Sequence, residues 1–292
     1  MQEMKKLPGI TTLITDADNT IYNWVQYIVP CLEAMAEYLQ RKTGFTLDQI
    51  SLSFKKVFEK YRTNEYPFVL QEADIFQDLR GDFQQFQKEL IDPTRIIFNQ
   101  TRQRTLKLYP GVARTLWTII NSGIRVIVLS DAPSFSAEQR LEHLGVSPYI
   151  WALYALESYP LPDTTRLDQS IINRIKTGFY RSRIGNVVQL PLRYEKPNTE
   201  GLKFLLEEEG ITPDQAILVG DNCKKDIRIA QELGIADVWA RYGTIISPEA
   251  REKLGYYSAA SIQKRNVSQE GDTEYHPTYT IDYFEEILSL LV

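Results

Sequence analysis

The chain has 292 residues, of which 43% are hydrophobic and 24% charged, and its formal net charge at pH 7 is −5. This length suits one large domain or a core with a smaller second domain, and the composition is that of a globular protein. A weakly acidic chain has no general attraction for nucleic acid or an anionic membrane, so neither is expected as a partner. A phosphorylated ligand would need local positive charge or a metal at its site.

The amino-terminal sequence MQEMKKLPGI is not followed by the apolar segment of a secretory signal, and no apolar stretch approaches the length of a membrane span. The two cysteines, Cys31 and Cys223, indicate a reducing compartment and not a disulfide framework. We therefore expect a cytoplasmic protein. An assembly of identical chains is left open.

The first predicted element is a short strand at 13–15, which leads into the acidic loop 16–20. The stretch that follows is rich in helical patterns and lacks comparable strand runs. Apolar residues at helical spacing predict three helices in it, at 26–40, 48–62 and 76–90.

This helix-rich stretch predicts a separate helical cap domain at 21–108. The turn sequence Tyr109-Pro110-Gly111 marks the return of the chain to the core. The core is then formed by residues 1–20 and 109–292.

Strands and helices alternate in the second half of the chain. Three further apolar runs are typical of buried parallel strands, at 124–129, 216–219 and 238–240. Four helical patterns each end just before a glycine, at 112–122, 136–144, 198–209 and 226–233. Alternation of this kind predicts an α/β fold with a doubly wound, Rossmann-like parallel sheet.

The stretch 158–194 interrupts this alternation. It is predicted to be either a small second insertion or a long surface loop with one helix near 168–176. Its basic residues are Arg166, Arg174, Lys176, Arg181, Arg183 and Arg193.

Four polar loops of the predicted core carry groups suited to phosphoryl transfer. In an open parallel sheet, ligands bind at the carboxyl edge of the strands, where such loops converge. A carboxylate can attack phosphorus, a second acid can protonate the leaving oxygen, and hydroxyl and ammonium groups can hold phosphate oxygens. Carboxylates also supply the oxygen ligands that Mg²⁺ prefers.

The sequence offers one residue for each of these tasks. Asp16 can attack as the nucleophile, and Asp18 can act as acid and then as base. Ser130 and Lys196 can bind phosphate oxygens, Lys196 from the start of a helix whose first turn contains Pro197. Asp221 and Asp226 can hold magnesium.

These residues resemble the motifs of the haloacid dehalogenase superfamily. Asp16-Ala17-Asp18-Asn19-Thr20 resembles its first motif, DxDx followed by Thr or Val, and Ser130 after VIVL resembles its second. Lys196 resembles the third motif, and Gly220-Asp221 with Asp226 the fourth. The resemblance covers roughly 7–24 and 108–245, and the stretch 158–194 departs from it.

The resemblance implies a magnesium site formed by Asp16, Asp221, Asp226 and the backbone carbonyl of Asp18, and a helical cap that closes over it. It also implies a reaction. Relatives that dehalogenate lack an acid at the position of Asp18, because a halide needs no proton. We therefore expect a magnesium-dependent phosphatase that hydrolyses a small phosphomonoester, of nucleotide or sugar phosphate type, through an aspartyl-phosphate.

Two alternatives stay open at this point. A phosphomutase would use the same residues. A non-catalytic phosphate-binding or regulatory protein could act through the Arg-rich stretch 158–194.

Overall fold

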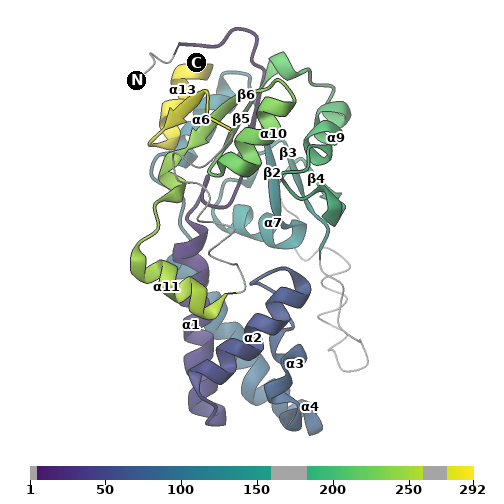
Figure 1. Ribbon diagram of the computed structural model, residues 1–292, viewed down its shortest axis with the longest axis vertical. Coiled ribbons are helices and arrows are strands. Elements are labelled where there is room, and N and C mark those ends of the chain that lie inside the picture. The colour runs from purple at the N-terminus through teal and green to yellow at the C-terminus, as the bar shows by residue number, and fades with distance from the viewer. Residues whose placement is uncertain (1–4, 159–182, 259–274) are drawn as a thin grey trace.

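The computed structural model describes residues 5–158, 183–258 and 275–292. It has two lobes (Figure 1): a sheet covered by helices, and below it in the view a lobe made of helices alone. The first lobe is called the core here and the second the cap. The carboxyl terminus lies in the core.

The core sheet has seven parallel strands in the order β4-β3-β2-β1-β5-β6-β7. Its strands are β1 (Thr12–Thr15), β2 (Arg125–Pro133), β3 (Ala152–Leu156), β4 (Asn186–Leu190), β5 (Ala216–Gly220), β6 (Ala236–Ala240) and β7 (Tyr279–Ile281). Strand β1 is central, with Ile14 opposite Ile127 of β2 on one side and Leu218 of β5 on the other. The chain builds the sheet outwards from β1 first through β2 and then through β5, so the strand order reverses beside β1, where α/β folds bind ligands.

Successive residues of the strands face opposite sides of the sheet, and helices cover both. Leu13 packs in one hydrophobic cluster with residues of α6 (Val112–Asn121) and α7 (Ser134–His143). Ile14 packs in another with residues of α9 (Glu200–Glu209) and α10 (Arg228–Glu232). The predicted doubly wound α/β fold is thereby confirmed.

The structure also contains strands that the sequence analysis did not predict. These are β3, β4 and β7. Strand β4 lies within the stretch 158–194 and forms an edge of the sheet, so part of that stretch belongs to the core fold. The helix expected near 168–176 lies outside the described residues.

The cap is built around two long helices that follow β1. Its helices are α1 (Trp24–Thr43), α2 (Leu47–Tyr61), α3 (Val69–Glu72), α4 (Phe83–Phe86) and α5 (Asp92–Thr105). Helix α1 packs along α5. Helix α2 begins at a capping box, in which Thr46 and Gln49 satisfy each other's backbone N–H groups.

The predicted helix at 76–90 is wrong in its first part, before Phe83. Residues Asp74–Phe76 and Asp78–Gly81 form separate 3₁₀ turns. The helix begins only at Phe83, because the Asp82 side chain accepts a hydrogen bond from the Gln85 N–H and caps it there. From Phe83 the chain stays helical through a π turn into α5.

A segment from the far end of the chain also contributes to the cap. Helix α11 (Pro248–Tyr257) follows β6 and lies against α1 and α2 (Figure 1). Lys253 of α11 forms an ion pair with Glu33 of α1 at 3.0 Å, and the Tyr256 hydroxyl donates to Asp48 of α2. The cap lobe therefore combines helices from 24–105 with a helix from within 109–292.

The two connecting segments between core and cap lie side by side. Tyr22 forms an antiparallel bridge with Leu108, and the Tyr109 N–H donates to the Ile21 carbonyl at 3.0 Å. Among the helices in the described ranges, none is both long and apolar enough to cross a lipid bilayer. Cys31 and Cys223 are both buried free thiols.

Candidate active site

Asp16 is the first residue after β1, at the carboxyl edge of the sheet. Its N–H donates to the Val219 carbonyl of β5 at 2.9 Å, which continues the strand pairing by one residue. The chain then turns at Asn19, whose backbone is left-handed at φ 59°, a conformation that asparagine tolerates better than most residues. The Asn19 side chain accepts from the Trp24 N–H at 3.1 Å and so connects the loop to the start of α1.

Lys196 is buried between two carboxylates at the base of the site. Its Nζ lies 2.8 Å from Asp16 Oδ1 and 2.6 Å from Asp226 Oδ1, and it also donates to the Leu129 carbonyl at 3.3 Å. Burial alone would lower the pKa of Lys196, but the two carboxylates outweigh it and raise that pKa well above its ordinary value. The ammonium group is therefore a permanent positive charge beside Asp16.

Burial raises the pKa of Asp16, whereas it acts to lower that of Lys196. Desolvation raises the pKa of Asp16 from 3.8 to about 7, the nearby charge of Asp226 adds to this rise, and Lys196 opposes it. An additional cation beside Asp16 would favour the ionised form that can attack as a nucleophile.

The fourth motif loop brings Asp221 and Asp226 beside Asp16. Oxygen atoms of these three carboxylates all lie within 4.8 Å of one another. The loop can pass this close because Gly220 has no side chain: an added Cβ would overlap the Asp226 carboxyl group. Asp226 lies in a π turn, Cys223–Ile227, where its Oδ2 accepts from the Asn222 N–H at 3.1 Å.

This oxygen-only donor set fits magnesium. Mg²⁺ takes hard oxygen ligands and is usually held by one or two carboxylates together with water and substrate phosphate. Asp16, Asp221 and Asp226 are the described residues that could supply such ligands. The backbone carbonyl of Asp18, also expected as a ligand, stays a prediction.

Ser130 ends the regular part of β2 and lies in the same cleft as Asp16. Its buried Oγ accepts from the Ala132 N–H at 3.1 Å and keeps its own proton available for donation. Ser130 and Lys196 are thus brought to one site with Asp16, as two phosphate-binding groups would need to be.

Lys196 does not lie at the start of a helix, which corrects the expected position. Helix α9 begins at Glu200, several residues later, and the segment before Lys196 is a 3₁₀ turn, Leu192–Tyr194, that follows β4. The Lys196 N–H instead donates to the Asp131 side chain at 2.9 Å. Its backbone is therefore fixed by a side chain of the second motif loop.

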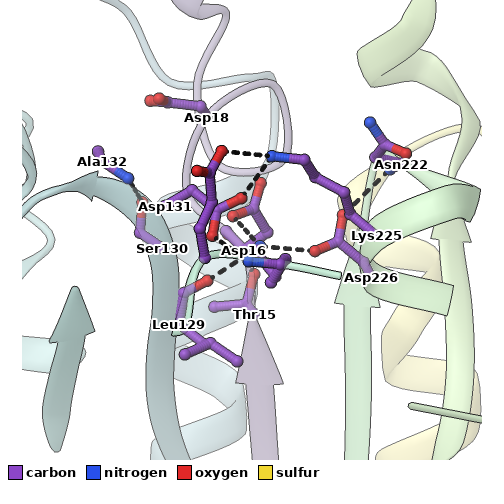
Figure 2. Close-up of polar contacts among 12 residues, drawn as sticks. Thr15, Asp16, Asp18, Leu129, Ser130, Asp131, Ala132, Asn222, Lys225 and Asp226 are labelled. Carbon is purple, nitrogen blue, oxygen red and sulfur yellow. Dashed lines mark hydrogen bonds and ion pairs between the residues drawn. The ribbon is translucent and has the colours of Figure 1, made fainter. Parts of the chain in front are cut away.

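Asp131 and Lys225 support the site in a way that the sequence analysis did not find. The Lys225 Nζ lies 2.7 Å from Asp131 Oδ2 (Figure 2). It also lies 3.5 Å from Glu195 Oε1. Burial lowers the pKa of Lys225, but these two carboxylates outweigh the effect and raise it. Asp131 thereby connects the second, third and fourth motif loops, and its position directly after Ser130 was the available signal.

Asp18 makes a different set of contacts, on the cap side of the site. In Figure 2 its carboxylate points away from Asp16 and Lys225. Asp18 Oδ1 accepts from the Tyr22 hydroxyl at 2.5 Å and from Arg140 Nη1 at 2.6 Å. Arg140, on α7, also lies 3.4 Å from Glu65 of the cap through its Nη2. The signal for Arg140 was a charged residue on the apolar face of a predicted helix.

All of these groups line one cleft between core and cap, with a volume of about 980 Å³. Asp16, Asp18, Ser130, Lys196, Asp221 and Asp226 line it from the core. The cap contributes Phe58, Arg62 and Asn64, and the chain around α11 contributes Arg251 and Leu254.

Family models and known proteins match this chain over most of its length. A model of the haloacid dehalogenase-like hydrolase matches residues 10–234, and a HAD-hydrolase-like model matches residues 193–287. The chain belongs to the haloacid dehalogenase-like hydrolase family.

Two relatives of this chain are named phosphatases. Glyceraldehyde 3-phosphate phosphatase of Methanocaldococcus jannaschii is 20% identical over 231 residues, which cover 78% of this chain and 84% of the relative. Phosphoglycolate phosphatase of Vibrio vulnificus is 24% identical over 173 residues, which cover 59% of this chain and 60% of the relative.

Likeness of fold does not select a reaction within the family. A 2-haloacid dehalogenase from Pseudomonas syringae pv. Tomato DC3000 superposes with a TM-score of 0.56 at 15% identity, over 96% of each chain. This likeness shows the fold alone, so the reaction has to be argued from the site.

Proposed function

We propose that this protein is a magnesium-dependent phosphatase that hydrolyses a small phosphomonoester through an aspartyl-phosphate on Asp16. The observation that carries the proposal is the pairing of the buried Asp16 carboxylate with Lys196 at 2.8 Å, beside Asp221 and Asp226. A nucleophilic carboxylate needs positive charge around it to approach a phosphate dianion, and this arrangement offers it.

The first half of the reaction transfers the phosphoryl group to the protein. An Asp16 oxygen attacks phosphorus, the bond to the leaving oxygen breaks, and Asp18 gives its proton to that oxygen. In the second half, Asp18 takes a proton from water, whose oxygen attacks phosphorus and releases Asp16 and inorganic phosphate. Ser130 and Lys196 donate hydrogen bonds to the phosphoryl oxygens in both halves.

Asp16, Asp221 and Asp226 would hold the magnesium ion. When bound, Mg²⁺ supplies the positive charge that offsets the repulsion between carboxylate and phosphate. The proton-transfer role of Asp18 separates this proposal from dehalogenation, since a halide leaves without a proton.

The cleft supports a small substrate. Its volume of about 980 Å³ is at the upper end of the range usual for small-molecule sites. Cap and α11 side chains such as Arg62 and Arg251 face the cleft and would contact the part of the ester that leaves. The names of the two relatives make short phosphorylated aldehydes and acids worth testing beside nucleotides and sugar phosphates.

The test is phosphate release from a panel of these esters, with and without Mg²⁺. Wild-type protein should release phosphate only with the metal, and a chelator should stop it. Asp16→Asn should lower the rate by more than about 10³-fold, because it removes the nucleophile. Acid-quenched wild-type protein should carry a covalent phosphoryl label that Asp16→Asn lacks.

The alternatives give different results in the same assay. A phosphomutase would acquire the label on Asp16 but convert a sugar phosphate to its isomer with little free phosphate. A protein that only binds phosphate would acquire no label from any ester, and that result would overturn the proposal. A cytoplasmic location and the absence of nucleic acid and membrane partners stay predictions.

A further inference from the structure

Arg140 is a buried cation outside the motifs of the family, and it joins the proposed acid to the cap. Its side chain is only 1% exposed, although it belongs to α7 of the core. Nη1 lies 2.6 Å from Asp18 Oδ1, Nη2 lies 3.4 Å from Glu65 Oε2, and Nε donates to the Ser136 carbonyl at 3.1 Å. Each nitrogen of the guanidinium group therefore faces a different oxygen atom, with hydrogen bonds to Ser136 and Asp18 and an ion pair with Glu65.

The environment of Arg140 fixes its direction. The guanidinium group lies over the ring of Tyr22, 5.5 Å from its centroid, and the Tyr22 hydroxyl donates to the same Asp18 oxygen. Neighbouring carboxylates outweigh burial and raise the pKa of Arg140 well above its ordinary value, so it stays charged. Two rigid donors thus converge on Asp18 Oδ1, which leaves the carboxylate little freedom to rotate.

This direction suits the role proposed for Asp18. In an in-line transfer the leaving oxygen lies on the opposite side of phosphorus from the attacking Asp16 oxygen. An acid for that oxygen must therefore lie beyond the phosphorus as seen from Asp16. The Asp18 carboxylate points away from Asp16 in Figure 2, and its partner Arg140 also pairs with Glu65 of the cap. The contacts to Arg140 and Tyr22 hold it in that position.

Glu65 adds a connection to the cap. It lies between α2 and α3, accepts a hydrogen bond from the Tyr27 hydroxyl of α1, and shares the Arg140 guanidinium with Asp18. One cation is therefore divided between a carboxylate of the core and a carboxylate of the cap. Any shift of Glu65 relative to α7 changes how Arg140 holds Asp18.

We propose that Arg140 is a positioning residue for the general acid Asp18, and that Glu65 makes this positioning depend on the cap. The inference rests on the proposed phosphatase function. It assigns to an arginine outside the four motifs the task of aiming the proton at the leaving oxygen.

The experiment compares esters whose leaving groups differ in their need for a proton. An alkyl phosphate requires protonation of its oxygen, whereas 4-nitrophenyl phosphate leaves as a stabilised anion. The value of kcat/KM, which reports phosphoryl transfer to Asp16, is measured for both esters at saturating Mg²⁺. A residue that only supports the fold would change both values alike.

Arg140→Met should lower kcat/KM for the alkyl ester by about 30-fold or more and for the nitrophenyl ester by no more than about 3-fold, given the usual contribution of a general acid. Arg140→Lys should restore part of the difference. Glu65→Gln should show the same selective loss, at about 3- to 10-fold. Glu65→Gln keeps the buried cation, so it also serves if Arg140→Met does not fold.

The matched control is Glu72→Gln. Glu72 of the cap also accepts from a tyrosine hydroxyl, that of Tyr61 at 2.8 Å, and pairs with a cation, Lys60 at 2.7 Å. This variant should match wild type on both esters. Equal losses on the two esters in the Arg140 and Glu65 variants, or no loss at all, would overturn the inference. The proposed function would still stand if the wild-type protein hydrolyses the esters and this hydrolysis depends on Asp16. Absence of any such hydrolysis in wild type would instead overturn the proposed function, and this inference with it.

Discussion

One lysine of the core and one arginine of the cap show that the two lobes place charge differently. Lys196 of the core is 5% exposed and lies between Asp16 and Asp226. Arg62 of the cap is 54% exposed and pairs with Glu195 of the core across the mouth of the cleft. Both pairs join segments far apart in the sequence, but only the first is withdrawn from water.

The core holds its charged groups in fixed positions, whereas the mouth of the cleft makes contacts that can change. At the sheet edge the strands hold the charges in place and burial magnifies each interaction. At the mouth of the cleft the Arg62 charge lies near solvent, which screens it and lets its contact form and break at little cost. Reaction type should therefore reside in the core, and choice of substrate in the cap.

The largest effect is expected from removal of the core cation. Lys196→Met leaves Asp16 and Asp226 together without their shared positive charge, which should lower the free energy of unfolding by about 3–5 kcal/mol. Phosphatase activity should also be lost. Denaturant unfolding of both proteins in chelator measures the change, and addition of Mg²⁺ should recover part of it. A variant as stable as wild type in chelator would contradict this view of the core.

Two glycines, Gly220 of the core and Gly81 of the cap, differ in how much space surrounds them. Gly220→Ala in the core would place a Cβ on the Asp226 carboxyl group, so we expect a loss of about 1–3 kcal/mol and weaker binding of Mg²⁺. Gly81→Ala in the cap meets no atom within 4 Å and should change stability by less than about 1 kcal/mol. Thermal and denaturant unfolding compare the two. Equal costs at both positions would show that the loop around Gly220 adjusts freely.

The response to pH and metal should also be confined to the core. The pKa of Asp16 is about 7 in the folded chain and 3.8 ordinarily. Between these two pH values, Asp16 keeps a proton in the folded chain that it has lost in the unfolded chain. The contribution of Asp16 to stability is therefore greatest at low pH and declines between about pH 4 and about pH 7. Mg²⁺ needs the ionised carboxylate, so the stabilisation that it gives should grow over the same range.

Thermal unfolding with and without Mg²⁺ measures this response. We expect saturating Mg²⁺ to raise the Tm by about 5 °C near pH 8 and by clearly less near pH 5. Asp16→Asn should show no such growth with pH. A metal effect that is equal at both pH values in wild type would argue against Asp16 as a ligand.

The smallest effect is expected from the exposed cation of the cap. Arg62→Gln removes the pair with Glu195 and should cost about 0.2–1 kcal/mol, because solvent already screens these charges. Its main consequence should be a change in relative kcat/KM among substrates, measured over the ester panel. A stability loss as large as that of Lys196→Met would remove the distinction between the two regions.

The sequence predicted four of the strands of the sheet, and it predicted correctly that the motif residues lie at one site. Strands β1, β2, β5 and β6 each contain a run of apolar residues that is followed by a polar loop, which is a local signal. Strand β4 has a half-exposed, mixed sequence and β7 has only three residues, so neither carries such a signal. In the cap, capping by Asp82 decides where a helix starts, and apolar spacing at 76–90 does not reveal it.

The supporting charges of the site could not be predicted from spacing. Arg140 and Asp18 are 122 positions apart, and Lys225 and Asp131 are 94 apart. These contacts exist only once the sheet has brought its loops to one edge and the cap has folded against it. The chemistry of a motif can be inferred from the local sequence. The groups that position the motif residues and pair with their charges can be found only from the complete fold.

Helix α11 has a consequence for engineering hybrids of this family. Grafting 21–108 onto another core would transfer the insertion but leave behind Lys253 and Tyr256, the partners of Glu33 and Asp48. The transferred helices would then expose the surface that α11 covers, because α11 stays behind with the core of this protein. A workable chimaera of this protein has to exchange two non-contiguous pieces together, so recombination at a single insertion point would be a poor route to new substrates here.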